Sequence, residues 1–262
     1  MKINYVKAGL LAGMVCWGIG NARAEEATPV AASLDVPVLS AYVWRGQVLN
    51  DEAVVQPGLT VSKNGFALNA WSSYNAAGSY SGDNEKKFSE VDLTGSYTHS
   101  LGPASVGVGL IQYLFPNQTL STENGDVAYP ETSEAFATIG LPEIPLAPTL
   151  TVYRDLDTIE GVYAVLGVSQ SFGLSEQVSA VASASVGAGD KDYNLGYFGE
   201  DKSALNDVNF GLALPIAVRD NLTIKPAASY VFLPDSSISD AAKSVYGDDN
   251  QFVASVTASY TF

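Results

Sequence analysis

The sequence predicts an all-β fold: a closed antiparallel transmembrane β-barrel of twelve strands, with short periplasmic turns and long extracellular loops. Three observations predict it. Apolar and small polar residues alternate along most of the chain, short turns and long polar loops follow one another in strict alternation, and the final strand ends on an aromatic residue. Beyond residue 24, every apolar stretch is shorter than a membrane-spanning helix requires.

The first 24 residues have the three-part pattern of a secretory signal peptide. Lys2 and Lys7 precede an apolar run, and Ala22-Arg23-Ala24 forms a small-residue cleavage site. The run is too short to cross a bilayer as a stable helix. Cleavage after Ala24 removes Cys16, so we expect a mature chain with no cysteine and no disulfide.

We expect residues 25–33 to form a short lead-in and residues 34–262 to form the barrel, in the outer membrane of a Gram-negative cell.

The charge balance excludes nucleic acid as a partner. The chain has 13 basic and 28 acidic residues, a net charge of −15, and loss of three basic residues with the signal leaves 10 against 28, or −18. Nucleic-acid phosphates need clustered Lys and Arg instead.

Twelve extended segments account for the chain beyond the lead-in. The alternation is clear in residues 87–101, where Val91 and Leu93 stand opposite Glu90 and Asp92. No segment has a convincing helical period, and we expect one short helix at 239–246, inside a loop. The expected strands are residues 34–47, 52–63, 65–76, 87–101, 103–115, 132–142, 148–156, 159–173, 176–188, 206–219, 221–233 and 251–262.

The connections between these segments are of two kinds. Those after the even-numbered strands are short, and Asn64-Gly65 is typical of a type I′ hairpin turn, which needs positive φ at both central residues. Those after the odd-numbered strands are mostly long and polar. A zigzagging sheet then has one end of short turns and one end of long loops, as outer-membrane barrels do. A soluble β-sandwich explains the alternation equally well, but it gives no reason for this asymmetry.

The last strand is expected to close onto the first, because lipid tolerates no unpaired strand edge. Its apolar face carries Phe252, Tyr260 and Phe262, which we assign to the aromatic girdles at the two membrane interfaces. A terminal aromatic residue resembles the signal read by barrel-assembly machinery. This machinery, bound through the C-terminal strand, and outer-membrane lipid are therefore expected partners. Four further aromatic residues are assigned to the girdles, with stacking on sugars as the alternative: Tyr42, Trp44, Trp71 and Tyr230.

Five short motifs follow one another along the chain: AYVWRGQ at 41–47, NGFALNAWSS at 64–73, SEVDLTGSY at 89–97, VGVGLIQYLFP at 106–116 and GVYAVLGVSQSF at 161–172. In this order and spacing they resemble strands of the TorF-type porins of Gram-negative bacteria, also called the Gcw_chp family. The resemblance spans nearly all of residues 36–262. It implies a barrel with a pore, and it brings no known substrate or catalytic residue. Gln47 and the loop at 189–206 depart from the pattern, so no ligand preference carries over.

Alternation also places charged side chains in the lumen. Arg45, near the outer end of the first predicted strand, could pair there with Glu90, Asp92, Glu134 or Asp155. Two interpretations stay open: a salt bridge at the rim that ties the first strand to its neighbours, or a charged constriction that filters solutes. The candidate lumen or constriction residues are Arg45, Glu90, Asp92, Glu134, Asp155 and Lys225.

We expect no enzyme, no catalytic residue and no cofactor. The single histidine, His99, falls beside a predicted periplasmic turn, where a rim residue is expected. Asp190, Asp192 and Asn194 have calcium-loop spacing, but the glycine is one position late and no helices flank them, so we predict no dedicated metal site. The acidic loops could instead share divalent cations with outer-leaflet lipid. Their carboxylates are those of Asp83, Glu85, Glu123, Asp126, Asp190, Asp192, Glu200, Asp201, Asp235, Asp240, Asp248 and Asp249.

The function expected from these features is passive diffusion of small hydrophilic solutes through the barrel. The predicted lumen face is rich in Ser, Thr, Ala and Gly, and twelve strands leave a wider lumen than eight. An acidic rim focuses the field at the pore mouth, so we expect a preference for cations. The alternative is a structural or adhesive outer-membrane barrel that acts through its acidic extracellular loops without a conducting pore.

Overall fold

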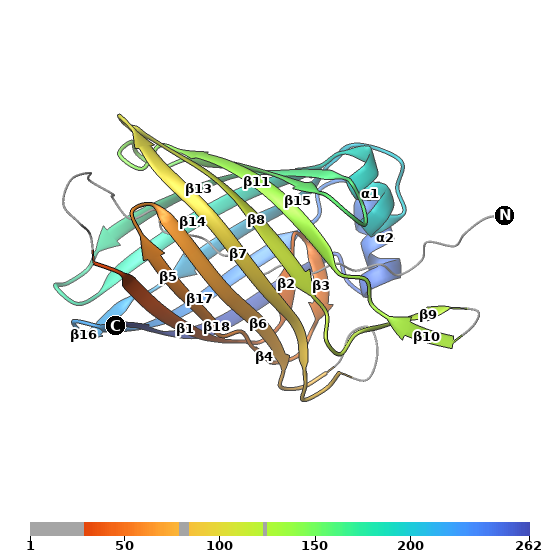
Figure 1. Cartoon of the computed structure of the whole chain (residues 1–262), viewed down its shortest axis with the longest axis horizontal. Coiled ribbons are helices and arrows are strands. Elements are labelled where there is room, and N and C mark those ends of the chain that lie inside the picture. Colours follow the sequence, from red (N-terminus) through yellow and green to blue (C-terminus); the bar gives the residue numbers. More distant parts are fainter. Residues whose placement is uncertain (1–28, 79–83, 123–124) are drawn as a thin grey trace.

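The wall of the molecule is a closed ring of antiparallel strands (Figure 1). The computed structural model describes residues 29–78, 84–122 and 125–262. The predicted signal peptide, residues 25–28 of the predicted lead-in, and the acidic residues Asp83 and Glu123 lie outside them. Neither helix in the described part of the chain is long and apolar enough to cross a membrane.

Twelve strands form the ring within the described residues, which confirms the predicted fold class. The short strands β4 (Val54–Val55) and β16 (Ile216–Arg219) extend the lines of β5 and β15. In ring order the wall strands are β1 (Ala31–Leu39), β5 (Gly58–Lys63), β6 (Phe66–Asn75), β7 (Phe88–Leu101), β8 (Ala104–Leu114), β11 (Thr132–Gly140), β12 (Thr149–Asp155), β13 (Val162–Gly173), β14 (Ser179–Gly189), β15 (Ala204–Ala213), β17 (Leu222–Phe232) and β18 (Asn250–Thr261).

The ring closes between the first and last wall strands, as predicted. β18 pairs with β1 from Ser33 opposite Thr261 to Leu39 opposite Ser255, and it pairs with β17 on its other side. Each peptide group in the wall therefore faces a neighbouring strand, and the hydrocarbon core of a membrane meets no open strand edge. Strand β1 begins at Ala31, three residues before the predicted start of the barrel.

The two ends of the barrel differ in the way that the connections predict. At the short-turn end, Asn64 and Gly65 have φ values of 51° and 84°, which confirms the predicted type I′ turn between β5 and β6. The C-terminus lies at this end (Figure 1). The opposite end, called here the loop end, carries the hairpin of β9 (Thr119–Thr122) and β10 (Gly125–Ala128), together with α1 (Lys191–Phe198) and α2 (Ser236–Tyr246).

The predicted helix at 239–246 is confirmed as part of α2, whereas α1 is an addition to the prediction. Helix α1 begins after Asp190, whose side chain accepts a hydrogen bond from the backbone N–H of Tyr193, and ends before Gly199 at φ 75°. An acidic N-cap residue at the start of a helix and a left-handed glycine just after its end are both common capping features. The prediction that residues 190–196 are loop was therefore wrong.

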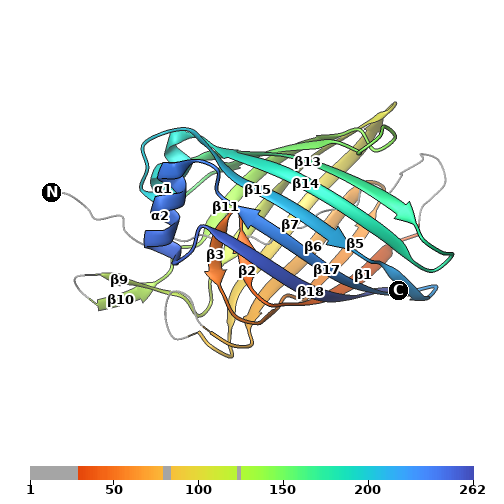
Figure 2. The ribbon, with the colours of Figure 1, turned by 180° about the vertical axis from the view of Figure 1, so that it is seen from behind.

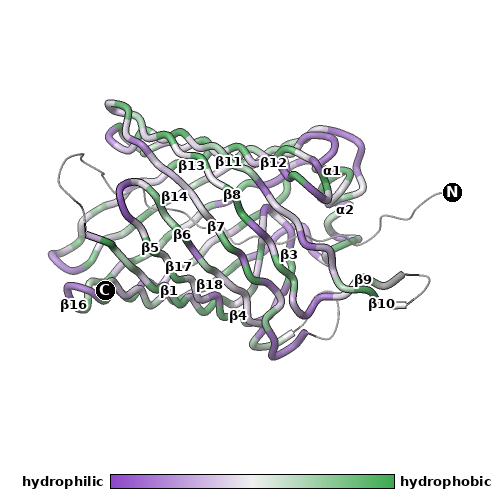
Figure 3. Tube along the Cα trace, viewed as in Figure 1, coloured by the Kyte–Doolittle hydropathy of each residue, from purple (hydrophilic) through white to green (hydrophobic). Residues whose placement is uncertain are grey.

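Side chains on the wall alternate between lipid and lumen. Along β18, Phe252, Val256 and Tyr260 are 61%, 50% and 39% exposed on the outer surface, while the intervening Val253 and Thr257 are buried inside. Phe262, just past the end of β18, contacts Tyr260 edge to face with a centroid distance of 5.0 Å. Figure 3 shows apolar and polar positions alternating along the strands.

The first predicted strand, residues 34–47, is wrong beyond Leu39. There the chain leaves the wall and folds inward as a hairpin of β2 (Tyr42–Trp44) and β3 (Gln47–Asn50), which both views place inside the ring (Figures 1 and 2). Arg45 and Gly46 form its tight turn with φ values of 47° and 83°. Apart from the half-buried Val43, every side chain from residue 41 to residue 50 is buried, so neither face of the hairpin suits a wall position between lipid and solvent.

The barrel makes a matched pair of substitutions informative. We expect Val256→Arg, on the lipid face midway along β18, to lower the free energy of unfolding by about 2–4 kcal/mol, because a charge at the bilayer midplane is costly. The adjacent Ser255→Arg, on the lumen face, should cost clearly less, because that face does not meet hydrocarbon. Equilibrium unfolding of the heat-modifiable folded form in lipid vesicles measures both. Equal losses for the two variants would contradict the assignment of faces.

Candidate functional site

The lumen has two halves of different character. Near the short-turn end it is lined by small polar side chains that remain half-buried or exposed to solvent, and we call this half the polar vestibule. Alternation along the wall assigns to it Ser96, Thr138, Ser169, Ser183, Thr223 and Ser259. Toward the loop end the lumen is filled by a cluster of buried, largely aromatic side chains from the wall, the β2–β3 hairpin and both helices.

The hairpin is held in this packed half by contacts on several sides. The ring of Trp44 packs edge to face on Tyr197 of α1 at 5.2 Å, and the ring of Tyr42 lies 5.8 Å from that of Trp71 on β6. At the turn, a Cβ on Gly46 would lie 2.8 Å from the side chain of Leu233, so only glycine fits there. The assignment of Tyr42, Trp44 and Trp71 to the membrane girdles was therefore wrong.

Arg45 at the hairpin tip forms an ion pair with Glu134 of β11. The two guanidinium nitrogens donate to the two carboxylate oxygens at 2.8 and 2.7 Å. The pair is nearly closed to solvent, with 9% of Arg45 and 2% of Glu134 exposed. The Tyr113 hydroxyl donates a further hydrogen bond to Glu134 at 2.7 Å. Among the four carboxylates considered for Arg45, Glu134 is its partner, and the pair lies within the lumen rather than at its rim.

Aromatic rings surround the same guanidinium. Its central carbon lies 4.4 Å from each of the ring centroids of Trp44, Tyr153 and Tyr163, and 5.9 Å from that of Tyr193. We call the three tyrosines of the wall and α1 the tyrosine cage. Each ring face attracts a cation, and more strongly where water is excluded.

Close packing and one hydrogen bond hold the tyrosines of the cage in place. The Tyr163 hydroxyl donates to Asp207 of β15 at 2.7 Å. A Cβ on Gly187 would lie 2.0 Å from that hydroxyl, and a Cβ on Gly161 would lie 2.4 Å from the backbone of Tyr193. Glycine at these two positions leaves the room that the tyrosines occupy.

The other predicted lumen residues lie apart from the Arg45 pair. Glu90 is fully buried and accepts a hydrogen bond from Tyr42 at 3.1 Å, and Asp92 is buried beside it on β7. Asp155 accepts from Thr132 at 2.7 Å and from four successive backbone N–H groups of residues 157–160, so it organises the turn after β12. Lys225 lies half-buried on β17 opposite Thr257, toward the polar vestibule.

Sequence reasoning missed all three tyrosines of the cage, and also Tyr113 beside it. Tyr113, Tyr153 and Tyr163 occupy lumen positions near the loop ends of their strands. The alternation of side chains that places Glu134 and Asp155 in the lumen also places these three tyrosines there, and that was the available signal. Tyr193 had no such signal, because its helix was read as a loop.

The two helices cover the packed lumen at the loop end. Lys202 binds Asp235, the N-cap of α2, at 2.8 Å, and Asp249 just beyond α2 accepts from Ser239 at 2.5 Å and from Lys243 at 2.9 Å. The Tyr246 hydroxyl of α2 donates to the backbone of α1 at 2.8 Å. The described residues contain no group of three or more His, Cys, Asp or Glu side chains arranged to hold a metal ion.

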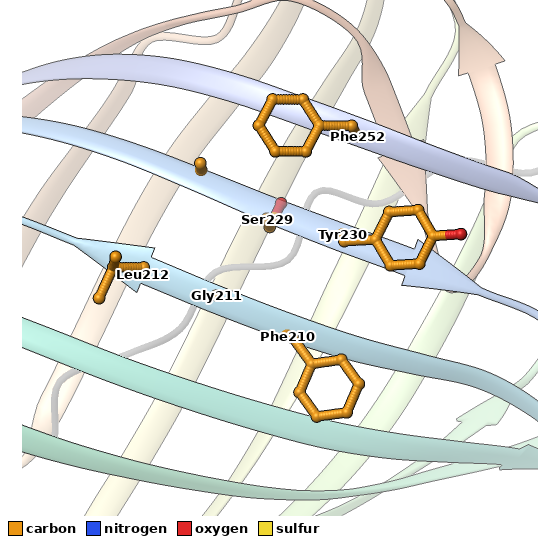
Figure 4. Close-up of a pocket in the computed structure, with 7 residues that line it drawn as sticks. Phe210, Gly211, Leu212, Ser229, Tyr230 and Phe252 are labelled. Carbon is orange, nitrogen blue, oxygen red and sulfur yellow. The ribbon is translucent and has the colours of Figure 1, made fainter.

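The outer wall also carries a shallow notch of about 280 Å³ between β15, β17 and β18 (Figure 4). Its sides are Phe210, Leu212, Tyr230 and Phe252, which are 42% to 61% exposed on the lipid-facing surface. Gly211, Ala228 and Ser229 form its floor. The notch therefore faces away from the lumen and is separate from the site around Arg45.

The fold defines an outer-membrane-type β-barrel of the small, porin-like kind. This chain belongs to the Gcw_chp family, described as a bacterial protein of unknown function, whose sequence model matches residues 23–260. No curated protein matches the chain in sequence.

Three solved barrels are similar in structure at low sequence identity. The NanC porin is 12% identical over 87% of this chain and 98% of its own, with a TM-score of 0.50. An outer-membrane channel from Pseudomonas putida F1 is 11% identical over 91% and 97%, with a TM-score of 0.52. The KdgM porin, solved with disordered oligogalacturonate, is 9% identical over 88% and 99%, with a TM-score of 0.51. These likenesses concern the fold.

The ion pair predicts a specific pattern of stabilities. We expect Arg45→Met to lower the free energy of unfolding by about 3–5 kcal/mol, because Glu134 is then left buried without a counter-charge. The double variant Arg45→Met/Glu134→Gln should lose clearly less than the single variant. Lys225→Met, which removes a half-buried lumen cation outside the pair, is the matched control and should change little. If the double variant were at least as unstable as Arg45→Met, the ion pair between Arg45 and Glu134 would not be the interaction that holds the hairpin.

The attachment of α2 should weaken in acid. Hydrogen bonds from Ser239 and then Lys243 lower the pKa of Asp249 to about 2, and Lys202 lowers the pKa of Asp235. Carboxylates with lowered folded-state pKa values stabilise the fold above their unfolded value of about 4, and this contribution is lost as the pH falls toward 2.

Pepsin digestion at pH 4 and at pH 2 tests this expectation. Cleavage within residues 236–249 should increase at the lower pH, and Asp249→Asn should already be cleaved at pH 4. Asp248→Asn, which changes the exposed neighbouring carboxylate, should behave as the wild type. Equal cleavage at both pH values would contradict the role of these contacts.

Proposed function

We propose that this barrel is an outer-membrane channel for the passive diffusion of small hydrophilic solutes, with a preference for cations. The observation that carries the proposal is the lumen itself. Its vestibule is lined by hydroxyl groups, and among the buried acidic and basic side chains of the described lumen five are acidic, Glu90, Asp92, Glu134, Asp155 and Asp207, and one is the guanidinium of Arg45. A lumen with this excess of acidic over basic groups favours cations over anions.

The position of the β2–β3 hairpin determines whether the channel conducts. In the form described above it fills the lumen between the vestibule and the helices, so solutes pass when the hairpin withdraws from Glu134. Residues 40–53 join wall strands at both of their ends, which lets the hairpin move while the ring of strands stays closed. The channel is therefore expected to open in discrete steps rather than to conduct continuously.

The loop end is taken as extracellular and the short-turn end as periplasmic. Exposed carboxylates at the loop end, such as those of Glu85, Asp126 and Asp240, would add to the attraction of cations, and they could share divalent cations with phosphate-bearing lipid. Phe252, Tyr260 and Phe262 would lie in the aromatic girdles, and the C-terminal strand would be the segment that assembly machinery reads. The proposal includes no catalytic step, and His99 faces outward beside the β7–β8 turn.

A structural or adhesive barrel is the second candidate, and the packed lumen favours it. A core of aromatic side chains from wall, hairpin and helices could fill the barrel permanently, as side chains do in smaller barrels. Such a protein would act through its acidic loops on a surface partner. The two candidates differ in one property, which is whether the hairpin can leave the lumen.

Single-channel recording in planar bilayers separates the two candidates. We expect stepwise conductance from the wild type, and a several-fold larger and more continuous conductance when residues 41–52 are replaced by a short Gly-Ser linker, because the lumen is then cleared. Absence of conductance from both proteins would favour the structural barrel. Under a KCl gradient the reversal potential should show cation selectivity that weakens as salt rises. An anion-selective pore would contradict the charge argument.

A further inference from the structure

We propose that Glu134 and the tyrosine cage form a binding site for the guanidinium or alkylammonium group of a solute, and that Arg45 occupies this site in the closed barrel in place of the solute. The inference rests on the proposed channel function and names the class of solute that the same lumen would recognise. It follows from the way in which the contacts of Arg45 are divided between the hairpin and the wall.

The receptor side of the site lies on the wall and on α1, and a long hydrogen bond from Gln47 to the Tyr193 hydroxyl, at 3.4 Å, joins it to the hairpin. Glu134 lies on β11, Tyr153 on β12, Tyr163 on β13 and Tyr193 on α1, whereas Arg45 belongs to the hairpin turn. Tyr113 fixes the carboxylate from β8 and Asp207 fixes Tyr163 from β15. If the hairpin withdraws, the guanidinium and the Trp44 ring leave together. One carboxylate and three tyrosine rings then remain in place around a vacated position.

The chemistry of these groups selects an organic cation. Both oxygens of Glu134 accept parallel hydrogen bonds from Arg45, an arrangement that a planar guanidinium matches better than a spherical ion. Two tyrosine faces at 4.4 Å add cation–π attraction, which is typical of sites for guanidinium and substituted ammonium groups. A single carboxylate is a poor donor set for a divalent metal ion. An anionic solute would meet the buried charge of Glu134 unscreened.

Occupation by Arg45 gives the site a consequence for opening. Withdrawal of the hairpin alone leaves a buried carboxylate without a counter-charge, which strongly disfavours the open form. A solute that carries the same cationic group restores the pairing with Glu134 and the ring contacts. It therefore exchanges with Arg45 at little net cost, and the arrival of the solute shifts the population toward the open form. The channel would open in response to the class of solute that it admits.

Binding of agmatine, which carries a guanidinium and an amine, tests the site without requiring conduction. The full barrel is refolded in detergent and titrated calorimetrically. Arg45→Ala, which vacates the cage, should bind agmatine at least about tenfold more tightly than the wild type. Lys225→Ala, which removes one lumen cation and leaves the cage filled, is the matched control and should bind as the wild type does. Adding Tyr153→Leu and Glu134→Gln to Arg45→Ala should abolish the gain.

Three results would overturn the inference: equal weak binding by Arg45→Ala and Lys225→Ala, equal enhancement in both, or displacement of agmatine from Arg45→Ala by equimolar potassium. If Arg45→Ala refolds poorly, the yield of its heat-modifiable form with and without millimolar agmatine is the readout. Rescue by agmatine supports the site, and no rescue overturns it. Bilayer recording tests the channel function separately. If the barrel does not conduct but Arg45→Ala binds agmatine, the binding site is supported and the channel function is contradicted. If the barrel conducts but Arg45→Ala does not bind agmatine, only the binding site is contradicted.

Discussion

Hydrocarbon offers no hydrogen-bond partner to a peptide group, and this constraint shapes the whole molecule. Each wall strand needs a neighbour on both sides, so β18 must return to β1 and the sheet must close. Closure with twelve strands leaves an interior that is wider than wall side chains alone can fill. In this protein the β2–β3 hairpin and two helices occupy the half of that interior nearest the loops, and small polar residues line the half that stays open.

The charge at the hairpin tip is what makes this filling specific. A guanidinium inside a closed lumen loses its hydration, and the loss is offset only where the geometry of its partners is good. Glu134 supplies two short hydrogen bonds, and four aromatic rings replace part of the lost solvation. Ring contacts with Trp71 and Tyr197 hold the rest of the hairpin, and Arg45 adds a charge pairing that only one position in the lumen satisfies. The same property makes the position recognisable to another cation of similar shape.

The wall could be predicted from the sequence because a two-residue period and the spacing of turns are local properties. Asn64-Gly65, the closing strand and the lumen position of Glu134 all follow from them. The hairpin could not be predicted in this way, since a strand that folds into the lumen has the same period as one in the wall. The distinguishing signal of the hairpin is that residues 47–50 do not alternate between a polar and an apolar face, since each face carries one polar and one apolar side chain. Tyr153 and Tyr163 were missed because tyrosines near strand ends fit a membrane girdle equally well, and Tyr193 was missed because its helix was read as a loop.

The location of the hairpin is the central claim, and the accessibility of two matched cysteines tests it most directly. Val48 is 4% exposed on β3 in the lumen, and Val127 is 47% exposed on the β9–β10 hairpin at the loop end. The predicted mature chain has no cysteine of its own, so Val48→Cys and Val127→Cys can each be labelled alone with a bulky maleimide on folded protein in vesicles. Cysteine at 127 should react at once and cysteine at 48 only after unfolding. Equal rates in the folded protein would place β2–β3 outside the lumen and contradict the account.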